Sequence, residues 1–506
     1  MEPPSNERDP LLPSRRLAQD GGLAGDQVAH ERLDPKPTYL FWSLLKASFP
    51  VIVSYILQNS IQTTSVLIAG RLGPDELSVS AFSLMLAFVT GDGSHVSLTG
   101  WCVALGGTTA LDTLGSQAFT GAHPKDLAIH FQRCIVLLWL LLIPVCVLWW
   151  FIEPVLLALG QSGPLSRDVQ IFLRVLTIGA PGYIGFESLK KYLQCQGIMG
   201  ASTVILAVVF PINIVLNVFL IHHTSLGILG SPVALSITYW LCFVLLALLT
   251  WSSAEHKQNA VWDGFQPSAV FNPRGCYVFL KLAIPGILMV GTEWAAFEIV
   301  ALAAGRLGAL PLAAQAAVMT TDQILNTIPF GIGVAASARV GNLIGAKAAG
   351  AARYAAHAAA LLSVIVGIVV MVAMIAAKDV YGYLFSDDVD VVKLVAQVMP
   401  LVASFQVADG LAGSCGGVLR AQGRQHLGAL FNCVAYYVLA LPLGITLAFH
   451  PKARLGLQGL WIGQVVALFI VGLGEYYVVW RSDWELEIKR GEERNEEEAK
   501  RRADSE

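Results

Sequence analysis

Residues 277–304 read YVFLKLAIPGILMVGTEWAAFEIVALAA, an apolar stretch that contains two acids, Glu293 and Glu298. A helix needs about 20 apolar residues to cross a bilayer, so this stretch is long enough to span one. A charged side chain at the bilayer centre costs roughly 2.5–3.5 kcal/mol, and such groups usually face a cavity, take up a proton or bind a cation. The stretch therefore predicts a membrane helix that carries a functional acid.

The rest of the chain has the same apolar character. Of its 506 residues, 55% are hydrophobic and 14% are charged, against about 25% charged residues in ordinary soluble domains. Twelve windows have spanning length, namely 44–69, 78–104, 128–151, 169–189, 201–221, 229–251, 277–304, 311–336, 355–376, 391–414, 427–449 and 457–480. The second window is the least regular, because Gly91-Asp92-Gly93-Ser94 interrupts it. We predict an all-α polytopic membrane protein with twelve transmembrane helices.

Short motifs of the first half recur in the second half in the same order. Residues 70–73 (GRLG) return at 305–308, an offset of 305 − 70 = 235. Residues 193–197 (LQCQG) resemble 419–423 (LRAQG) at an offset of 226, and 226–230 (LGILG) resemble 455–459 (LGLQG) at 229. Ordered matches at nearly one offset indicate a duplication. Since each half has six spans, both copies enter the membrane from the same side, as parallel repeats.

These patterns divide the chain into five parts. We predict a disordered cytoplasmic N-tail (1–40), an N-lobe with spans one to six (41–252), a cytoplasmic linker (253–276), a C-lobe with spans seven to twelve (277–481) and a charged cytoplasmic C-tail (482–506) that forms a short solvated helix.

Loop charges predict that both termini are cytoplasmic. With this orientation the inner loops hold twelve basic residues and the outer loops seven, in agreement with the positive-inside rule. No apolar region followed by a cleavage site precedes the first window, so we expect no secretory signal. Residues 7–12 (ERDPLL) resemble an acidic dileucine sorting signal. They favour a vacuolar or endosomal membrane, with the plasma membrane as the alternative.

Two further acids lie within apolar windows, Asp322 in the eighth and Asp409 in the tenth. Glu298 follows Glu293 by five residues and so points about 140° away from it around a helix. One of the two can face a cavity while the other contacts a neighbouring helix. Several carboxylates in one dry cavity repel one another, and burial disfavours their charged form, so such a site takes up protons. A cationic substrate would then displace the proton.

Uncharged polar residues accompany the acids. The first window places Tyr55 and Gln58 on one helix, and the fifth contains Asn213. These can line a cavity, although amides in membranes also bond between helices. Trp294 and Tyr437 offer aromatic faces to an organic cation. Glu187 precedes Lys190 and Lys191 at the spacing of a structural salt bridge on one helix.

Other classes of function are disfavoured. Basic residues are dispersed, so no nucleic-acid surface is expected. The P-loop, HExxH, GxSxG and dinucleotide motifs are missing, and the eight cysteines form no CxxC pair. We therefore expect a protein that is not an enzyme and that has no catalytic residue, metal site or cofactor. Energy for transport would come from an ion gradient.

Over residues 45–480 the chain resembles the multidrug and toxic compound extrusion (MATE) transporters of the eukaryotic branch. The resemblance rests on residues 110–119 (ALDTLGSQAF), 191–197 (KYLQCQG), 335–342 (AASARVGN), 416–420 (GGVLR) and 459–463 (GLWIG). It implies two six-helix lobes that form a V, and export of organic cations in exchange for protons or sodium.

The resemblance also implies roles for particular residues. Glu293, Trp294 and Glu298 meet the family's motif in the seventh span, and Asp409 stands where the family commonly has an acid. In the eighth span Thr320 takes the place of an acid found in animal members, and Asp322 lies two residues away. Either one can therefore face the site.

The main hypothesis is a secondary active antiporter that exports organic cations or other xenobiotics in exchange for protons by alternating access. Glu293 and Asp409 would bind protons or the cation. Sodium coupling is an alternative, as is a lipid-linked or sugar flippase of the same broad superfamily, which would instead need cationic residues in its cavity. A membrane scaffold or sensor is the non-transport alternative. The expected partners are the lipid bilayer and small organic cations, and we expect the protein to act as a monomer.

Overall fold

The structure, a computed structural model, describes residues 37–92, 95–98, 100–158 and 160–503 and is almost wholly α-helical. Residues 1–36 of the predicted N-tail, with the dileucine pattern, lie outside the described residues, whereas residues 37–40, predicted to be disordered, form the start of the first helix. The first half comprises α2 (Pro37–Ala69), α3 (Pro74–Phe88), β1 (Val89–Asp92), β2 (His95–Leu98), α4 (Gly100–Gly107), α5 (Thr109–Thr120), α6 (Asp126–Trp150), α7 (Ile152–Ala158), α8 (Gly163–Leu176), α9 (Ala180–Cys195), α10 (Ala201–His222), the 3-10 turn η1 (Gly227–Leu229) and α11 (Gly230–Ser252).

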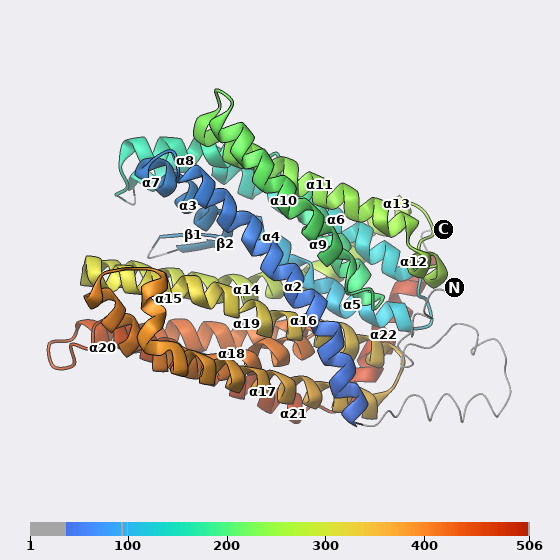
Figure 1. The fold of residues 1–506 in the computed structure, drawn as a ribbon. Coiled ribbons are helices and arrows are strands. Elements are labelled where there is room, and N and C mark those ends of the chain that lie inside the picture. The colour runs from blue at the N-terminus through green and yellow to red at the C-terminus, as the bar shows by residue number, and fades with distance from the viewer. Residues whose placement is uncertain (1–36, 93–94, 99, 159, 504–506) are drawn as a thin grey trace, which may run out of the picture.

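Two short helices, α12 (Ala254–Asn259) and α13 (Pro267–Val270), connect the halves. The second half comprises α14 (Pro273–Leu307), α15 (Ala309–Leu325), α16 (Thr327–Gly345), α17 (Ala349–Tyr381), the 3-10 turn η2 (Gly382–Leu384), α18 (Val389–Gln422), α19 (Gln425–Asn432), the π-helical segment η3 (Cys433–Ala440), α20 (Leu441–Phe449), α21 (Leu457–Trp480) and α22 (Trp484–Ala503). The two halves form two facing layers of helices (Figure 1).

The fold class predicted from the sequence is confirmed, with one departure in the second span. Among the described residues, ten helices are long and apolar enough to cross a membrane, and α8 with α9, bent by 52°, forms an eleventh span. The second predicted span is divided into α3, the antiparallel hairpin β1–β2, α4 and α5, so it does not pass the same test. When the divided segment from α3 to α5 is counted as one further span, the total is the predicted twelve.

The hairpin explains why the offset between the halves changes. Pro50 lies inside α2 and Pro285 inside α14, at 285 − 50 = 235, the offset of the GRLG motif. Helices α3, α4 and α5 have 15, 8 and 12 residues, and their counterparts α15 and α16 have 17 and 19. The helical lengths match, so the hairpin is an insertion of about ten residues that lowers the offset to 226 at the next motif.

The first helix of each half crosses to the other half. Leu44 of α2 packs with Ile332 and Ala336 of α16. Phe279 and Ile287 of α14 belong to the main hydrophobic cluster of the first half. Both contacts lie in the part of the helix before or near its internal proline. The halves are therefore interlocked.

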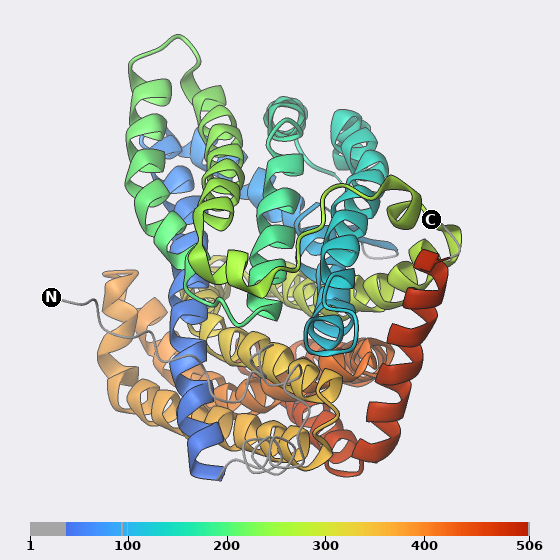
Figure 2. The same ribbon diagram turned by 90° about the vertical axis from the view of Figure 1, so that its right-hand side faces the viewer.

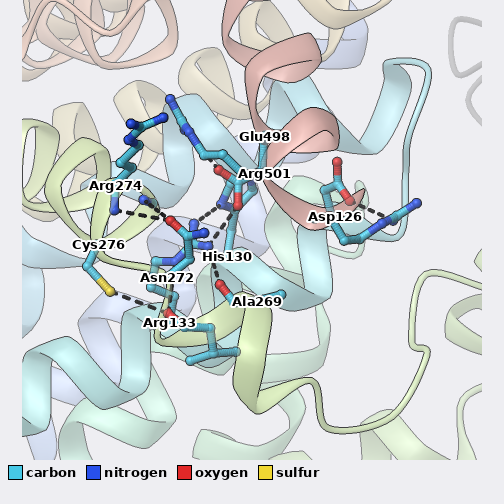
Figure 3. A network of polar contacts seen from close by, with 12 residues as sticks. Asp126, His130, Arg133, Ala269, Asn272, Arg274, Cys276, Glu498 and Arg501 are labelled. Carbon is cyan, nitrogen blue, oxygen red and sulfur yellow. Dashed lines mark hydrogen bonds and ion pairs between the residues drawn. The ribbon is translucent and has the colours of Figure 1, made fainter. Parts of the chain in front are cut away.

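The C-terminal helix α22 is not the solvated helix expected from its charges. Trp484 and Ile488 are 6% and 7% exposed and belong to a hydrophobic cluster of the second half, in which α22 packs against α16 and α17. At its other end, Glu498 is bound by Arg133 of α6 at 2.7 Å, and Arg502 contacts Asp126 at 2.9 Å (Figure 3). The helix thus runs along one end of the molecule from the second half to the first (Figure 2). We call this the α22 end.

The environment of Glu498 favours its charged form. Burial raises the pKa of this carboxyl, but the charges of His130 and Arg133 and the hydrogen bond from Arg133 together outweigh burial, so the pKa lies below its usual value. The ion pair with Arg133 is therefore present throughout the neutral pH range. It is lost only when the pH falls through the lowered pKa of Glu498.

Candidate functional site

Three acids from three helices gather inside the second half. Glu293 lies near the middle of α14, Asp322 near the end of α15 and Asp409 in the middle of α18. Asp409 and Asp322 are 3% and 5% exposed, and Glu293 is partly exposed. The carboxylate of Asp409 interacts electrostatically with those of Glu293 and Asp322. We call these three residues the acidic cluster.

Close helix packing positions the acidic cluster. On α18, a Cβ on Gly410 would lie 2.7 Å from the carbonyl oxygen of Ser363 on α17. A Cβ on Gly413 would lie 2.9 Å from the carbonyl oxygen of Pro329 on α16. Only glycine fits such contacts without a shift of the neighbour, so α18 is held tightly beside α16 and α17. Asp409 is thereby brought next to the junction of α15 and α16.

Amides, not cations, bind two of the three acids of the cluster, Asp409 and Asp322. Asn326, at the junction of α15 and α16, donates its side-chain amide to both oxygens of Asp409 at 3.1 and 3.3 Å. Gln406 donates to Asp322 at 3.0 Å. Within the described part of the chain, the cluster forms no ion pair. A buried carboxylate without a counter-charge is costly, so this arrangement favours either protonation or a bound cation.

Of the other residues predicted in the second half, some lie near the cluster and some do not. Trp294 stacks on Phe88 of α3 with ring centroids 5.4 Å apart. Tyr437 donates a hydrogen bond to the carbonyl of Thr292 at 3.0 Å. Glu298 lies on the same helix as Glu293 but forms no hydrogen bond or ion pair with the cluster among the described residues. Thr320 is exposed and its hydroxyl bonds to Ala316, so Asp322 is the residue of the eighth span that joins the cluster.

The residues predicted in the first half form separate polar networks. Gln58 donates to Tyr183 and to Glu187, each at 2.9 Å. Lys190 donates to Glu187 at 2.7 Å and to Gln58 at 3.0 Å, and its ammonium group lies 4.1 Å from the ring centroid of Tyr55. The predicted salt bridge of Glu187 is therefore formed with Lys190. The carboxylate in this network has a lysine as its counter-charge.

Asn213 lies in another network of the first half. Its amide donates to Thr238 of α11 at 2.9 Å, and its carbonyl accepts from Ser65 of α2 at 3.4 Å. Asn217, one turn later, donates to Ser65 at 3.1 Å. These are bonds between helices, the role that amides commonly have in membranes. They do not link Asn213 to the acidic cluster.

Ionic and polar contacts join the two halves at the α22 end. Asp112 of α5 accepts two hydrogen bonds from Lys191 of α9, at 2.9 and 3.1 Å, and one from Arg420 of α18 at 3.3 Å. All three side chains are buried. Thr113 and Gln117 of α5 also donate to the carbonyls of Arg420 and Ala421. The two halves are therefore in direct contact at this end.

The sequence analysis missed Glu475, a fourth buried acid of the second half. It lies on α21, has no exposed surface, and neither oxygen has a hydrogen-bond partner among the described residues. Its carboxylate interacts with Arg420 and with Glu293. Two glycines make room for it: a Cβ on Gly416 would lie 3.3 Å from one oxygen, and a Cβ on Gly428 would lie 3.0 Å from the other. The signal was present, since Glu475 is an acid inside the apolar window 457–480.

Comparisons with known proteins agree with this architecture. The family described as MatE matches residues 50–219 and 285–446. The two segments begin at Pro50 and Pro285, the prolines that occupy equivalent places in the halves. Multidrug and toxin extrusion protein 2 of Mus musculus is 32% identical over 96% of this chain and 80% of its own length. An uncharacterized transporter of Schizosaccharomyces pombe is 36% identical over 87% of this chain and 79% of its own length.

Solved structures show the same fold. The eukaryotic MATE transporter AtDTX14 superposes with a TM-score of 0.83 at 29% identity, covering 91% of this chain and 99% of its own. The bent form of the Vibrio cholerae MATE transporter VcmN superposes with a TM-score of 0.76 at 16% identity, covering 90% and 98%. The helical spans, the duplicated halves and these matches agree, and the chain belongs to the MATE family of membrane transporters.

Proposed function

We propose that this transporter is an antiporter that exports organic cations or other xenobiotics in exchange for protons, with Glu293 and Asp409 as the acids that bind the proton or the cation. The observation that carries the proposal is a contrast between the halves. Asp112 and Glu187, buried acids of the first half, have lysine partners, whereas Asp322 and Asp409 of the acidic cluster have only amide partners within the described structure. Its negative charge is left for a mobile cation.

Competition for the same carboxylates couples the two ions. A protonated cluster is neutral and attracts an organic cation weakly. When the cation binds, the charged carboxylates neutralise it and the proton leaves, so proton and substrate exclude each other. Trp294, whose ring stacks on Phe88 of the first half, is positioned to offer an aromatic face to the cation.

The proposed driving forces are modest. One unit of pH gradient supplies about 1.4 kcal/mol, enough for about tenfold accumulation in a one-for-one exchange. A membrane potential of 100 mV adds about 2.3 kcal/mol for each net charge moved. A cluster with more than one acid allows two protons to move for one monovalent cation, and the potential then contributes.

The proposed cycle opens and closes the contact between the halves. We propose that the α22 end faces the cytosol, because the basic residues of the loops concentrate there. Asp112, Lys191 and Arg420 would then hold the cytosolic side closed, and the two halves would rock apart to admit substrate from the cytosol. The name of the mouse relative, a multidrug and toxin extrusion protein, is consistent with transport outward from the cytosol or into an internal compartment.

The test is uptake of a fluorescent organic cation into proteoliposomes that are acidic inside. We expect uptake that depends on the pH gradient and collapses when a protonophore removes it. A matched sodium gradient at equal pH should give only the background of protein-free liposomes. Uptake driven by sodium alone would contradict proton coupling, and no cation movement under either gradient would contradict the substrate class.

The interactions of Glu475 with Glu293 of the acidic cluster and with Arg420 lead to a prediction about the path of the proton. We propose that it takes up and releases a proton between the acidic cluster and Arg420 during the cycle. Glu475→Gln should then slow uptake driven by the pH gradient several-fold, while Glu475→Asp, which keeps the acid, retains most of it. If Glu475 stays neutral throughout the cycle, the glutamine variant will transport at the normal rate. Initial rates of uptake in proteoliposomes distinguish these results.

A further inference from the structure

A basic pocket lies at the α22 end, outside the acidic cluster. It is a cavity of about 400 Å³ between the first part of α14, the connection from α18 to α19, and α22. Four side-chain cations line it, Lys281, Arg424, Arg490 and Arg494, against one carboxylate, Glu487. The lining thus has a formal excess of three positive charges. A volume of this size holds a small-molecule ligand.

The internal contacts of the pocket leave this positive charge largely uncompensated. Glu487 accepts from Arg490 at 2.7 Å and lies 3.8 Å from Arg424, so one carboxylate orders two guanidinium groups. Arg494 donates to the neutral side chain of Gln117 at 3.0 and 3.2 Å. Lys281 forms no ion pair with any residue that the structure describes.

Buried polar atoms in the pocket also lack partners. Gln422 is 1% exposed, and neither its side-chain oxygen nor its nitrogen has a hydrogen-bond partner among the described residues. Gln425 is equally buried, and its side-chain oxygen is likewise without a partner there. Buried amides are normally satisfied. Donors of Gln422 and of the surrounding cations are therefore available to an acceptor-rich ligand.

From these contacts we propose that the pocket, defined by Lys281, Gln422, Arg424, Arg490 and Arg494, binds a phosphorylated anion. Guanidinium groups match phosphate oxygens in pairs, and a phosphate offers acceptors to several donors at once. The side chains of Arg424 and Arg490 are 24% and 48% exposed, so a ligand can reach them from solvent. The inference concerns binding and is independent of which compound or ion is transported.

The position of the pocket gives binding a mechanical consequence. A Cβ on Gly423, at the end of α18, would lie 3.1 Å from Thr113 of α5 and 3.2 Å from Arg494 of α22. The pocket therefore borders the contact between the two halves. An anion that holds α14, the end of α18 and α22 together stabilises the arrangement in which the halves meet at this end.

Two sources of such an anion are available at the proposed cytosolic side. Phosphorylated lipid headgroups lie at the inner leaflet, where basic pockets between membrane helices bind them. Soluble phosphorylated compounds present the same chemistry without acyl chains. The two sources are distinguished by comparing a lipid with its own free headgroup.

The experiment measures thermal unfolding of the purified full chain in a neutral detergent. Three probes are titrated: dioctanoyl phosphatidylinositol 4-phosphate, free inositol 1,4-bisphosphate and inorganic phosphate. We expect a saturable rise in Tm with at least one of the first two. A rise with the lipid alone identifies a membrane source, and an equal rise with inositol 1,4-bisphosphate identifies a soluble source.

A pair of charge-matched variants tests whether the pocket is responsible. Lys281→Gln with Arg490→Gln removes two charges from the pocket, and we expect about a tenfold or greater loss of apparent affinity, equivalent to about 1.4 kcal/mol. Lys125→Gln with Lys257→Gln removes two charges elsewhere and should leave the affinity unchanged. Equal losses in both variants, or no rise in Tm with either the lipid or inositol 1,4-bisphosphate, would overturn the proposal. The Tm of each variant without probe shows whether it has folded.

Discussion

Glu293→Gln is expected to abolish proton-driven uptake of organic cations, and Asp409→Asn is expected to do the same. Each substitution keeps the size of the side chain and removes a carboxylate that forms no ion pair among the described residues. The side-chain amide of Asn326 donates to both oxygens of Asp409. Asparagine at position 409 has nearly the same shape as aspartate and fits the same space. The loss is therefore one of charge and protonation. Initial rates in proteoliposomes should fall to the background of protein-free liposomes.

Glu298→Gln is the matched control. Glu298 lies on the same helix as Glu293 but forms no hydrogen bond or ion pair with the acidic cluster among the described residues, so its variant should retain most of the uptake. A protein with Glu293→Gln that is folded, by its Tm and its elution in size-exclusion chromatography, and still accumulates the cation along the pH gradient would refute the assigned role. Equal loss in the Glu298 and Glu293 variants would indicate a general effect of charge on α14.

Asp112→Asn is expected to destabilise the protein by about 3–5 kcal/mol, because removing one partner of a buried ion pair leaves the other charge uncompensated. Here two cations lose their partner, Lys191 at 2% exposure and Arg420 at 5%. The contact between the halves at the α22 end should loosen at the same time. Chemical unfolding in detergent measures the first effect. The thiol reactivity of Cys195, which is buried and whose carbonyl accepts a hydrogen bond from Asn342 of the second half at 3.1 Å, measures the second.

Two further variants separate the ion pair from other effects. Asp263→Asn breaks an exposed pair with Lys125, whose side chains are 43% and 48% exposed, and such pairs contribute about 0–1 kcal/mol. Asp112→Asn combined with Lys191→Met removes one of the stranded charges and should recover part of the lost stability. An Asp112→Asn protein as stable as Asp263→Asn would contradict the importance of the buried pair.

The spans, the duplication and the three acids of the cluster could be predicted because each has a local signal. An apolar window, a repeated GRLG motif and an acid inside an apolar window are all visible in the sequence. Thr320 and Asp322 could not be separated in this way. Their difference depends on which one faces Gln406 of α18, a contact between residues 84 positions apart.

Partners that come from distant parts of the chain were not predictable. Helical spacing offered Glu187 both Lys190 and Lys191, but Lys191 instead pairs with Asp112, 79 residues away. The charges of α22 suggested a solvated helix, whereas its Glu498 is buried against Arg133, 365 residues earlier. Glu475 was missed for a different reason. Its signal was as clear as that of Asp409, and it was overlooked.

The unequal pairing of buried charges makes the two halves electrically different. In the first half Asp112 and Glu187 are offset by Lys190 and Lys191, so this half can move within the membrane without displacing net charge. In the second half Asp322 and Asp409 form no ion pair among the described residues, so in the proposed cycle the net charge of this half changes as protons and substrate bind. A charge that crosses the full field of 100 mV exchanges about 2.3 kcal/mol with it. If the halves rock as proposed, voltage acts on that motion through the second half, and we expect transient currents to accompany the motion even before substrate is added.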